Sequence, residues 1–567
     1  MRNRIKFMGI QWIALFIYLL TISVLEILSY HYEMASILAS RIWLLMGAFL
    51  LTVFVYESVK EVNFSVKHNE IIGLVCFFAM CVLLLIYMCS PNLATLSFES
   101  PQQTGAAVKA FKNSDWNYSG RAFLGDRYPN RQYLLTAIPT MIFGRSVIAL
   151  RAGFAYLFFI GMISVCLEFR AWLRKKEGAD GKYALIAISL LFLSPILMEY
   201  YKIFEQTLIP VCLTMMCIAS FLRFLRTNDV ISLLAVSWAG CMLPYSYTPS
   251  FSPAGLLLVM LFLCLVGYWS KYCGLPALSA KSKAAVVLLL FNITVFLFYG
   301  LKLIKGTMEA HDTDAITLKG LIDVLVGFIT DSDYAFWGIL SLVAFAYMIY
   351  SLTGRGKIHN FLIALWVFGT AFISQYLQGY IEYSNPGPIL QRNMVVIPVV
   401  ITAVFFLAYK HPTLFLHRIS NPVVSIYFAA VLGVGLFNLS REYKAMPLIN
   451  YSKPMHYLIE DAIETIPDMN ISADDHFVLC VVTDNIVLRN IKDYATYFFP
   501  NAVCESYSSE EFTHLENNDG SIPFLIYSDQ GISDKIDMEG REVAVPDFTW
   551  YKYIFCKSAD ESWGQVP

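Results

Sequence analysis

Acidic, basic and aromatic residues gather in one polar stretch, residues 91–146, which lies between long apolar segments. The stretch contains Glu99, the pair Asp115-Trp116 and the run Asp126-Arg127-Tyr128-Pro129. A carboxylate can take a proton from an attacking group, and a guanidinium can bind two oxygens of one phosphate. At a membrane face, such residues suit a reaction whose donor is a lipid and whose acceptor is in water.

The composition places these residues in a membrane protein. The chain has 567 residues, of which 57% are hydrophobic and 15% are charged, and its mean hydropathy is +0.57. No single water-soluble core could cover so many apolar residues, so we expect a polytopic membrane protein. The formal net charge of -2 lacks the basic excess that phosphate-backbone contacts need, which argues against nucleic-acid binding. None of the 12 cysteines has CxxC spacing, so cysteine does not indicate a metal site.

Apolar runs of spanning length predict an all-α membrane bundle of about 13 helices. The predicted spans lie near residues 7–28, 37–56, 71–90, 147–170, 183–200, 207–225, 229–246, 253–270, 284–303, 333–352, 360–378, 392–409 and 421–439. With the N-terminus in the cytoplasm, every short internal loop carries Lys or Arg, as the positive-inside rule requires. The first span follows basic residues but no cleavage site follows it, so we expect it to be retained.

The same count predicts which polar stretches lie outside the cytoplasm: residues 91–146, the turn around 202–205, 304–332, 379–391 and the tail from about 440. The apolar run 129–144 is too short to cross a bilayer, so we expect a helix along the outer interface. In the tail, apolar runs of strand length at 476–482, 522–528 and 551–556 alternate with polar stretches, which predicts an α/β domain.

The predicted organisation therefore has three parts. Residues 1–70 form an N-terminal two-helix membrane segment, residues 71–440 a transmembrane catalytic domain with the external loop 91–146, and residues 441–567 an extracytoplasmic α/β domain.

The order of the loop residues resembles the first external loop of the GT-C membrane glycosyltransferases, including the protein O-mannosyltransferase and aminoarabinose transferase branch. The resemblance covers roughly residues 71–440 and rests on Glu99, Asp115-Trp116, Asp126-Arg127-Tyr128-Pro129, Phe143-Gly144, Ala149-Leu150-Arg151, Ser194-Pro195, the run 200–205, Arg392 and Pro398. It implies a GT-C-like fold at the plasma membrane, with the active site on the extracytoplasmic side and a role in cell-envelope assembly.

The resemblance also implies an activity, the transfer of a sugar from a polyprenyl-phosphate donor to a glycan, lipid or protein acceptor, with membrane lipid around the bundle. It makes Glu99 the base or a metal-organising acid, and Asp126 and Glu205 the acids that close the site. A departing phosphate needs cationic charge or a divalent metal, Mg²⁺ or Mn²⁺, which Glu99 and Asp126 would hold. The residues expected to bind the substrate are Arg127, Tyr128, Lys202 and Arg392.

Two departures and several alternatives stay open. The chain has Phe98-Glu99 where the family often has two adjacent acids, and Tyr128 where one branch has Lys, which weakens the case for a metal and for a phosphate contact at 128. Lys202 and Arg392 could instead reach lipid headgroups.

A transporter or flippase of a lipid-linked or amphipathic substrate is the alternative function, and a structural protein with a sensory tail is another. Transporters place ionisable residues within their spans, whereas the acids here gather at one external face, which favours the enzyme. Within the spans, Asn292 is expected to bond to a neighbouring helix, and Tyr245 to line a lipid groove or to belong to an aromatic belt.

Overall fold

The computed structural model describes part of the chain. The described residues are 2–29, 31–65, 75, 78–79, 81–85, 104–108, 133–174, 208–246, 251–267, 270, 277–305, 452–469, 471–489, 491–512, 523–532, 541–544, 550–557 and 563–564.

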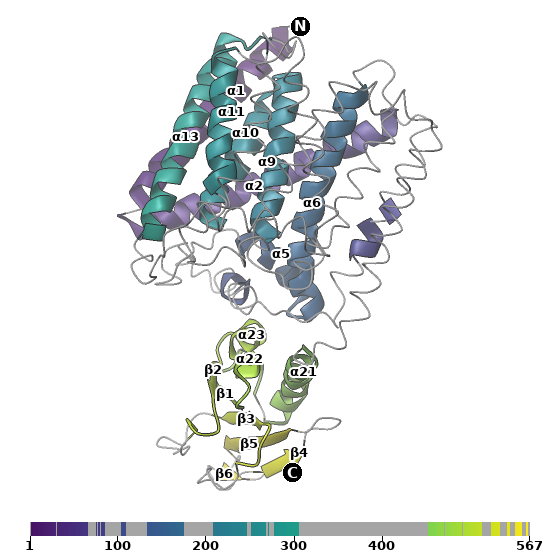
Figure 1. The fold of residues 1–567 in the computed structure, drawn as a ribbon, viewed down its shortest axis with the longest axis vertical. Coiled ribbons are helices and arrows are strands. Elements are labelled where there is room, and N and C mark those ends of the chain that lie inside the picture. Colours follow the sequence, from purple (N-terminus) through teal and green to yellow (C-terminus); the bar gives the residue numbers. More distant parts are fainter. Residues whose placement is uncertain are drawn as a thin grey trace, which may run out of the picture.

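Apolar helices form the N-terminal part of the structure and lie side by side in Figure 1. They are α1 (Arg2–Ser29), α2 (Glu33–Ser65), α5 (Tyr133–Phe143), α6 (Val147–Arg174), α9 (Leu208–Thr227), α10 (Val230–Ser246), α11 (Phe251–Leu265) and α13 (Ala280–Lys305). Among the described residues, α1, α2, α6, α9 and α13 are long and apolar enough to cross a membrane. The helices match the spans predicted within the described ranges. The total of about 13 stays a prediction.

The link between α9 and α10 shows how the sequence sets the helix ends. Asn228 has a φ of 57°, the left-handed conformation that commonly ends a helix, and its N–H donates to the Phe224 carbonyl at 2.8 Å. Asp229 then begins α10, because its carboxylate accepts the Ser232 N–H at 2.7 Å. This two-residue link makes α9 and α10 antiparallel neighbours, as the predicted topology requires.

Two tryptophans join α2 to α10. The rings of Trp43 and Trp238 are stacked, with centroids 4.9 Å apart and an interplanar angle of 7°. The Trp43 indole N–H donates to the Trp238 carbonyl at 3.1 Å, and the Trp238 indole N–H donates to the Trp43 carbonyl at 2.9 Å. Gly47 makes room for this pair, since a Cβ there would lie 2.7 Å from the Trp238 ring. Each indole is therefore satisfied by the other residue's backbone.

Asn292 on α13 confirms the expectation of a neighbouring partner. Its amide nitrogen donates to the Ser23 hydroxyl of α1 at 2.9 Å, and its oxygen accepts from the Ser237 hydroxyl of α10 at 2.7 Å. The Cys241 thiol lies 2.8 Å from the same oxygen. Asn292 is fully buried, so these contacts tie three helices together where water cannot take their place.

One acid does lie within a membrane-length helix, on α1. Glu26 is 2% exposed, lies within the candidate span Ile10–Ser29, and accepts a hydrogen bond from the Tyr245 hydroxyl. A buried carboxylate needs such a donor, because an unpaired charge in an apolar environment is costly. Tyr245 is also buried, so its hydroxyl points to Glu26 inside the bundle and the ring is not part of a surface belt.

The C-terminal residues 452–564, here called the C-terminal unit, form a sheet with three helices. Its helices are α21 (Ser452–Asp468), α22 (Ile486–Arg489) and α23 (Ile491–Phe498), and its strands are β1 (Val478–Val482), β2 (Val503–Tyr507), β3 (Phe524–Ser528), β4 (Arg541–Ala544), β5 (Tyr551–Lys557) and β6 (Trp563–Gly564). The predicted apolar runs coincide with β1, β3 and β5.

The sheet has the strand order β2-β1-β3-β5-β4, with β6 paired to β5. β1 is parallel to β2 and β3, while β5 is antiparallel to β3 and β4. β1 lies between β2 and β3 and is buried at every position, which explains its continuous apolar sequence. Asp461 on α21 binds the sheet, accepting from the Tyr527 hydroxyl at 2.6 Å and from Lys552 Nζ at 3.0 Å.

Candidate functional site

The short helix α5 lies at the end of the bundle nearest the C-terminal unit (Figure 1). It was predicted from residues 129–144, and its 11 residues rise only about 16 Å, well short of a bilayer core of about 30 Å. α5 packs against α6, and Gly153 of α6 allows a close approach to the backbone of Thr136. α5 therefore lies between the membrane helices and the C-terminal unit.

Residues 104–108 of the polar loop contact α5. The hydroxyls of Thr104 and Thr136 are 2.9 Å apart, and Ala107 is fully buried. Gly105 touches the C-terminal unit, since a Cβ there would lie 2.8 Å from the Tyr497 Cα. This part of the loop is enclosed between α5 and α23.

Tyr497 joins the C-terminal unit to the bundle. Its hydroxyl donates to the Ser146 carbonyl at 3.2 Å and lies 2.6 Å from the Thr140 hydroxyl. A phenol has one proton, so with that proton on Ser146 the Thr140 hydroxyl is the donor of the second bond. Burial raises the pKa of Tyr497, which keeps the phenol protonated.

Arg145 makes a second connection at the same place. Its Nη1 lies 2.7 Å from the Asp474 carboxylate and donates to the Phe498 carbonyl at 3.3 Å. Asp474 is 57% exposed, so this ion pair orients the two parts more than it stabilises them.

Arg151 is the buried cation of this region, with 1% of its surface exposed. It lies in the first turns of α6, and its positive charge acts on Tyr494 of α23: burial raises the pKa of Tyr494 to about 12, and Arg151 opposes that rise. A buried guanidinium is suited to holding an anion or a carboxylate. The run Ala149-Leu150-Arg151 was noted in the sequence, but its pattern does not reveal which side of α6 is buried.

The residues that the sequence assigns to catalysis and substrate binding lie outside the described residues. They are Glu99, Asp126, Glu205, Arg127, Tyr128, Lys202 and Arg392, so the proposed metal ligands Glu99 and Asp126 are among them. For Glu99, Asp126, Arg127 and Tyr128, the structure describes residues 104–108 of the same loop and the helix that begins at Tyr133. Their convergence on one site stays a prediction.

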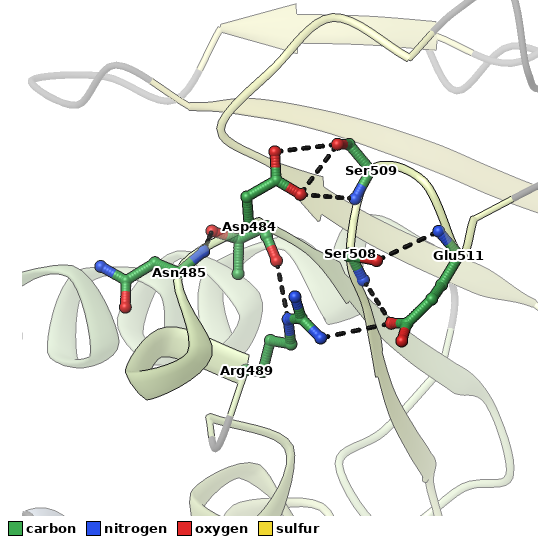
Figure 2. A network of polar contacts seen from close by, with 7 residues as sticks. Asp484, Asn485, Arg489, Ser508, Ser509 and Glu511 are labelled. Carbon is green, nitrogen blue, oxygen red and sulfur yellow. Dashed lines mark hydrogen bonds and ion pairs between the residues drawn. The ribbon is translucent and has the colours of Figure 1, made fainter.

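A second polar region lies in the C-terminal unit, where β1, β2 and β3 end at the same edge of the sheet (Figure 2). In open α/β sheets, ligands bind at such edges where the strand order reverses, as it does on either side of β1. Asp484 accepts from the Ser509 N–H at 2.9 Å, from its hydroxyl at 2.8 Å and from the Gln530 amide at 3.0 Å. These donors, above all the Ser509 N–H, lower the pKa of Asp484.

Glu511 is held in the same way. It accepts the Ser508 N–H at 2.9 Å and lies 3.2 Å from Arg489 Nη1, while Arg489 Nε donates to the Thr483 carbonyl at 3.0 Å. The Ser508 N–H is the largest cause of the lowered pKa of Glu511. Both acids are thus ionised and already bonded to protein donors, so they fasten loops and are poor candidates for a base. Among all described residues, no group of three or more His, Cys, Asp or Glu could hold a metal ion.

Comparison with known proteins gives structural similarity without sequence similarity. No protein-family model matches the chain, and no curated protein matches it in sequence. ArnT from Cupriavidus metallidurans in the apo state aligns over 85% of this chain and 97% of its own, with a TM-score of 0.43 and 13% identity. The same protein bound to undecaprenyl phosphate gives a TM-score of 0.42 and 11% identity over the same shares.

The archaeal oligosaccharyltransferase AglB from Archaeoglobus fulgidus, in complex with an inhibitory peptide and a dolichol-phosphate, aligns over 80% of this chain and 69% of its own, with a TM-score of 0.41 and 10% identity. ArnT and AglB are GT-C membrane glycosyltransferases, the class that the loop residues resemble.

Proposed function

We propose that the chain is a GT-C-type glycosyltransferase that moves a sugar from a polyprenyl-phosphate donor to an extracytoplasmic acceptor. The supporting observation is that part of the polar loop is enclosed between the membrane helices and the C-terminal unit, through Thr104, Gly105, Thr136 and Tyr497. A reaction between a lipid-borne donor and a water-borne acceptor needs a site at such an end of the bundle. Residues 104–108, which lie there, belong to the stretch 91–146 that contains the family-like residues.

In this proposal the loop carboxylates carry out the chemistry. The acceptor attacks the anomeric carbon of the sugar while Glu99 takes the proton of the acceptor. Asp126 and Glu205 close the site. Arg127, Lys202 and Arg392 bind the donor phosphate, with Tyr128 beside them, and Mg²⁺ or Mn²⁺ on Glu99 and Asp126 would add Lewis-acid charge at the departing phosphate.

The C-terminal unit, within the proposed domain 441–567, contributes acceptor contacts and no catalytic group. Asp484 and Glu511, at the edge of the sheet, are already bonded to protein donors, which supports this division. The proposal places this unit and the active site outside the cytoplasm, at the plasma membrane.

A transporter or flippase is the second candidate, and the burial of Glu26 within α1 is the observation that favours it. Glu26 lies only one turn from the end of α1 at Ser29, however, whereas transporters hold their substrates near the middle of the membrane. The position of Glu26 therefore fits a structural hydrogen bond to Tyr245 better than a transport site.

The test is to assay the purified chain with a panel of polyprenyl-phosphate sugars and to follow donor consumption. Glu99→Gln should keep folding and donor binding and lower turnover by about two to four orders of magnitude, the usual contribution of a general base. Arg127→Ala and Arg392→Ala should weaken donor binding, because a phosphate contact already exists in the ground state. Glu464→Gln, which removes an exposed acid of α21, is the matched control. Wild-type turnover in Glu99→Gln would refute the assignment of the base, and transport without donor consumption would favour the second candidate.

A further inference from the structure

A cavity of about 360 Å³ lies between α2, α6, α9 and α10, with α5 at one end. Its volume is within the range of ligand pockets, about 300–1,000 Å³. The cavity exists because several of the residues that line it are small: Gly47 and Ala48 on α2, Ala219 on α9 and Ala235 on α10. Ala48 and Thr52 of α2 line the cavity and are exposed, so it opens at the outer surface of the helices as a groove.

The groove changes character along its length. Toward α5 its lining is apolar, with Leu135, Ile138 and Leu157, whereas Glu168, Arg223 and Ser232 line the other end. Tyr156 and Glu168, both in the lining, are 12 positions apart on α6, which corresponds to about 18 Å along the helix. An amphipathic molecule fits this gradient in one orientation, with its polar part at the Arg223 end.

Two charged side chains line the polar end, Glu168 and Arg223, and Arg223 is the more exposed of the two. Both oxygens of the Glu168 carboxylate are bound by the Arg226 guanidinium, at 2.8 and 2.9 Å, and the Glu168 side chain is 6% exposed. Arg223 places its Nε 3.3 Å from Asp229 and keeps 29% of its side chain exposed. An anionic group in the groove therefore meets the guanidinium of Arg223, whose Nε is paired with Asp229, and the buried hydroxyl of Ser232, since both residues line it.

We propose that this groove binds a membrane phospholipid, with the phosphate at Arg223 and one acyl chain extending toward α5. An apolar groove open to a bilayer is filled by hydrocarbon, because water would find no partners along its apolar wall. A guanidinium can bind two phosphate oxygens, which fixes the headgroup. The site is separate from the proposed glycosyl transfer, since its polar end lies at the opposite end of α6 from Arg151 and the enclosed loop.

Native mass spectrometry of the full-length chain in detergent tests the proposal, with dioleoyl phosphatidylglycerol as the titrated phospholipid. Wild type should retain one phospholipid after mild delipidation and rebind it. Ala235→Phe should abolish phospholipid binding, because the added ring fills the groove. Ala48→Phe fills the groove from α2 and should have the same effect, so it serves as the test if Ala235→Phe does not fold. Arg223→Gln should weaken binding about tenfold, as expected for one lost charged hydrogen bond.

The controls remove matched features away from the groove. Lys283→Gln deletes an exposed charge of α13, and Val287→Phe enlarges an exposed apolar residue of the same helix, so both should bind phospholipid like wild type. Unchanged binding in folded Ala235→Phe or Ala48→Phe would overturn the site. Equal affinity in Arg223→Gln would overturn the headgroup position, and retention of a polyprenyl phosphate in place of a phospholipid would overturn the assigned ligand. None of these outcomes depends on sugar transfer, so the proposed function is tested separately.

Discussion

The hydroxyl of Tyr497 lies 2.6 Å from the hydroxyl of Thr140, a residue 357 positions earlier in the chain. The same Tyr497 hydroxyl reaches the Ser146 carbonyl, and Arg145 pairs with Asp474 beside it. These contacts make the C-terminal unit one wall of the enclosure around residues 104–108. Deleting the whole C-terminal unit would expose residues 104–108 to solvent. Single substitutions at Tyr497 therefore test the contact more specifically than truncation does.

Tyr497→Phe should loosen the C-terminal unit from α5 without unfolding either part. The change leaves the Thr140 hydroxyl and the Ser146 carbonyl without their partner, at a cost of about 1–2 kcal/mol. Limited proteolysis between α13 and α21, together with thermal unfolding in detergent, would measure the effect. Tyr551→Phe, at an exposed position of β5, is the control and should behave as wild type. Equal protease resistance of the two variants would show that the Tyr497 hydroxyl does not hold the contact.

Gly153→Ala should push α5 away from α6. A Cβ at Gly153 would come closer than 3.0 Å to the backbone of Thr136, a distance that real Cβ atoms essentially never show. Overpacking of this kind costs about 1–3 kcal/mol, seen as a lower midpoint of thermal unfolding. Gly255→Ala is the matched control, since nothing lies within 4 Å of a Cβ there and alanine favours a helix. A midpoint for Gly153→Ala that is no lower than that of Gly255→Ala would contradict the close approach of the two helices.

Asn292→Leu should lower stability by about 1–2 kcal/mol, because it removes the buried hydrogen bonds that Asn292 makes to the Ser23 and Ser237 hydroxyls. Thr294→Val changes an exposed hydroxyl of the same helix that bonds to its own backbone, and it should have a much smaller effect. The midpoint of thermal unfolding in detergent separates the two. The role of Asn292 in joining α1, α10 and α13 would be disproved by equal midpoints.

Asp484 should contribute to stability only above a limiting pH. Its pKa in the folded chain is lowered from 3.8, so its contribution is complete above the unfolded value and is lost as the pH falls through the folded one. The difference in unfolding midpoint between wild type and Asp484→Asn should therefore be constant above about pH 5 and shrink below pH 3.8. A difference that grows toward low pH would have the wrong sign for a carboxylate held by the Ser509 donors.

The sequence predicts the strongly apolar elements and misses those whose role depends on neighbours. β1 and β3 can be recognised in the sequence because they lie inside the sheet, where β1 is apolar throughout and β3 is apolar in its first three residues. β2, with the sequence VCESY, and β4, with REVA, were not singled out, because both lie at sheet edges where polar residues are tolerated. Pairing with a neighbour, rather than their own pattern, makes them strands.

Within the bundle, too, the sequence predicts the helices but not the side-chain contacts between them. The length and hydropathy of α1 and α6 predict spans, but they do not reveal that Glu26 meets Tyr245 from a helix 219 positions away, or that Arg151 is buried. Those facts depend on how the helices are rotated against one another. The roles of Glu99, Asp126 and Glu205 are predicted from their order in the sequence, and Glu99→Gln tests the first of them.

The reciprocal bonds between Trp43 and Trp238 have a consequence for biosynthesis. The two residues are 195 positions apart, and translation at about 5–20 residues per second delivers the second about 10–40 s after the first. During that interval the α1–α2 hairpin holds an indole N–H whose final partner has not been made. Trp43→Phe should therefore ease early insertion of the hairpin and weaken its later attachment to α10, so that crosslinks between α2 and α10 decline while the hairpin itself inserts normally.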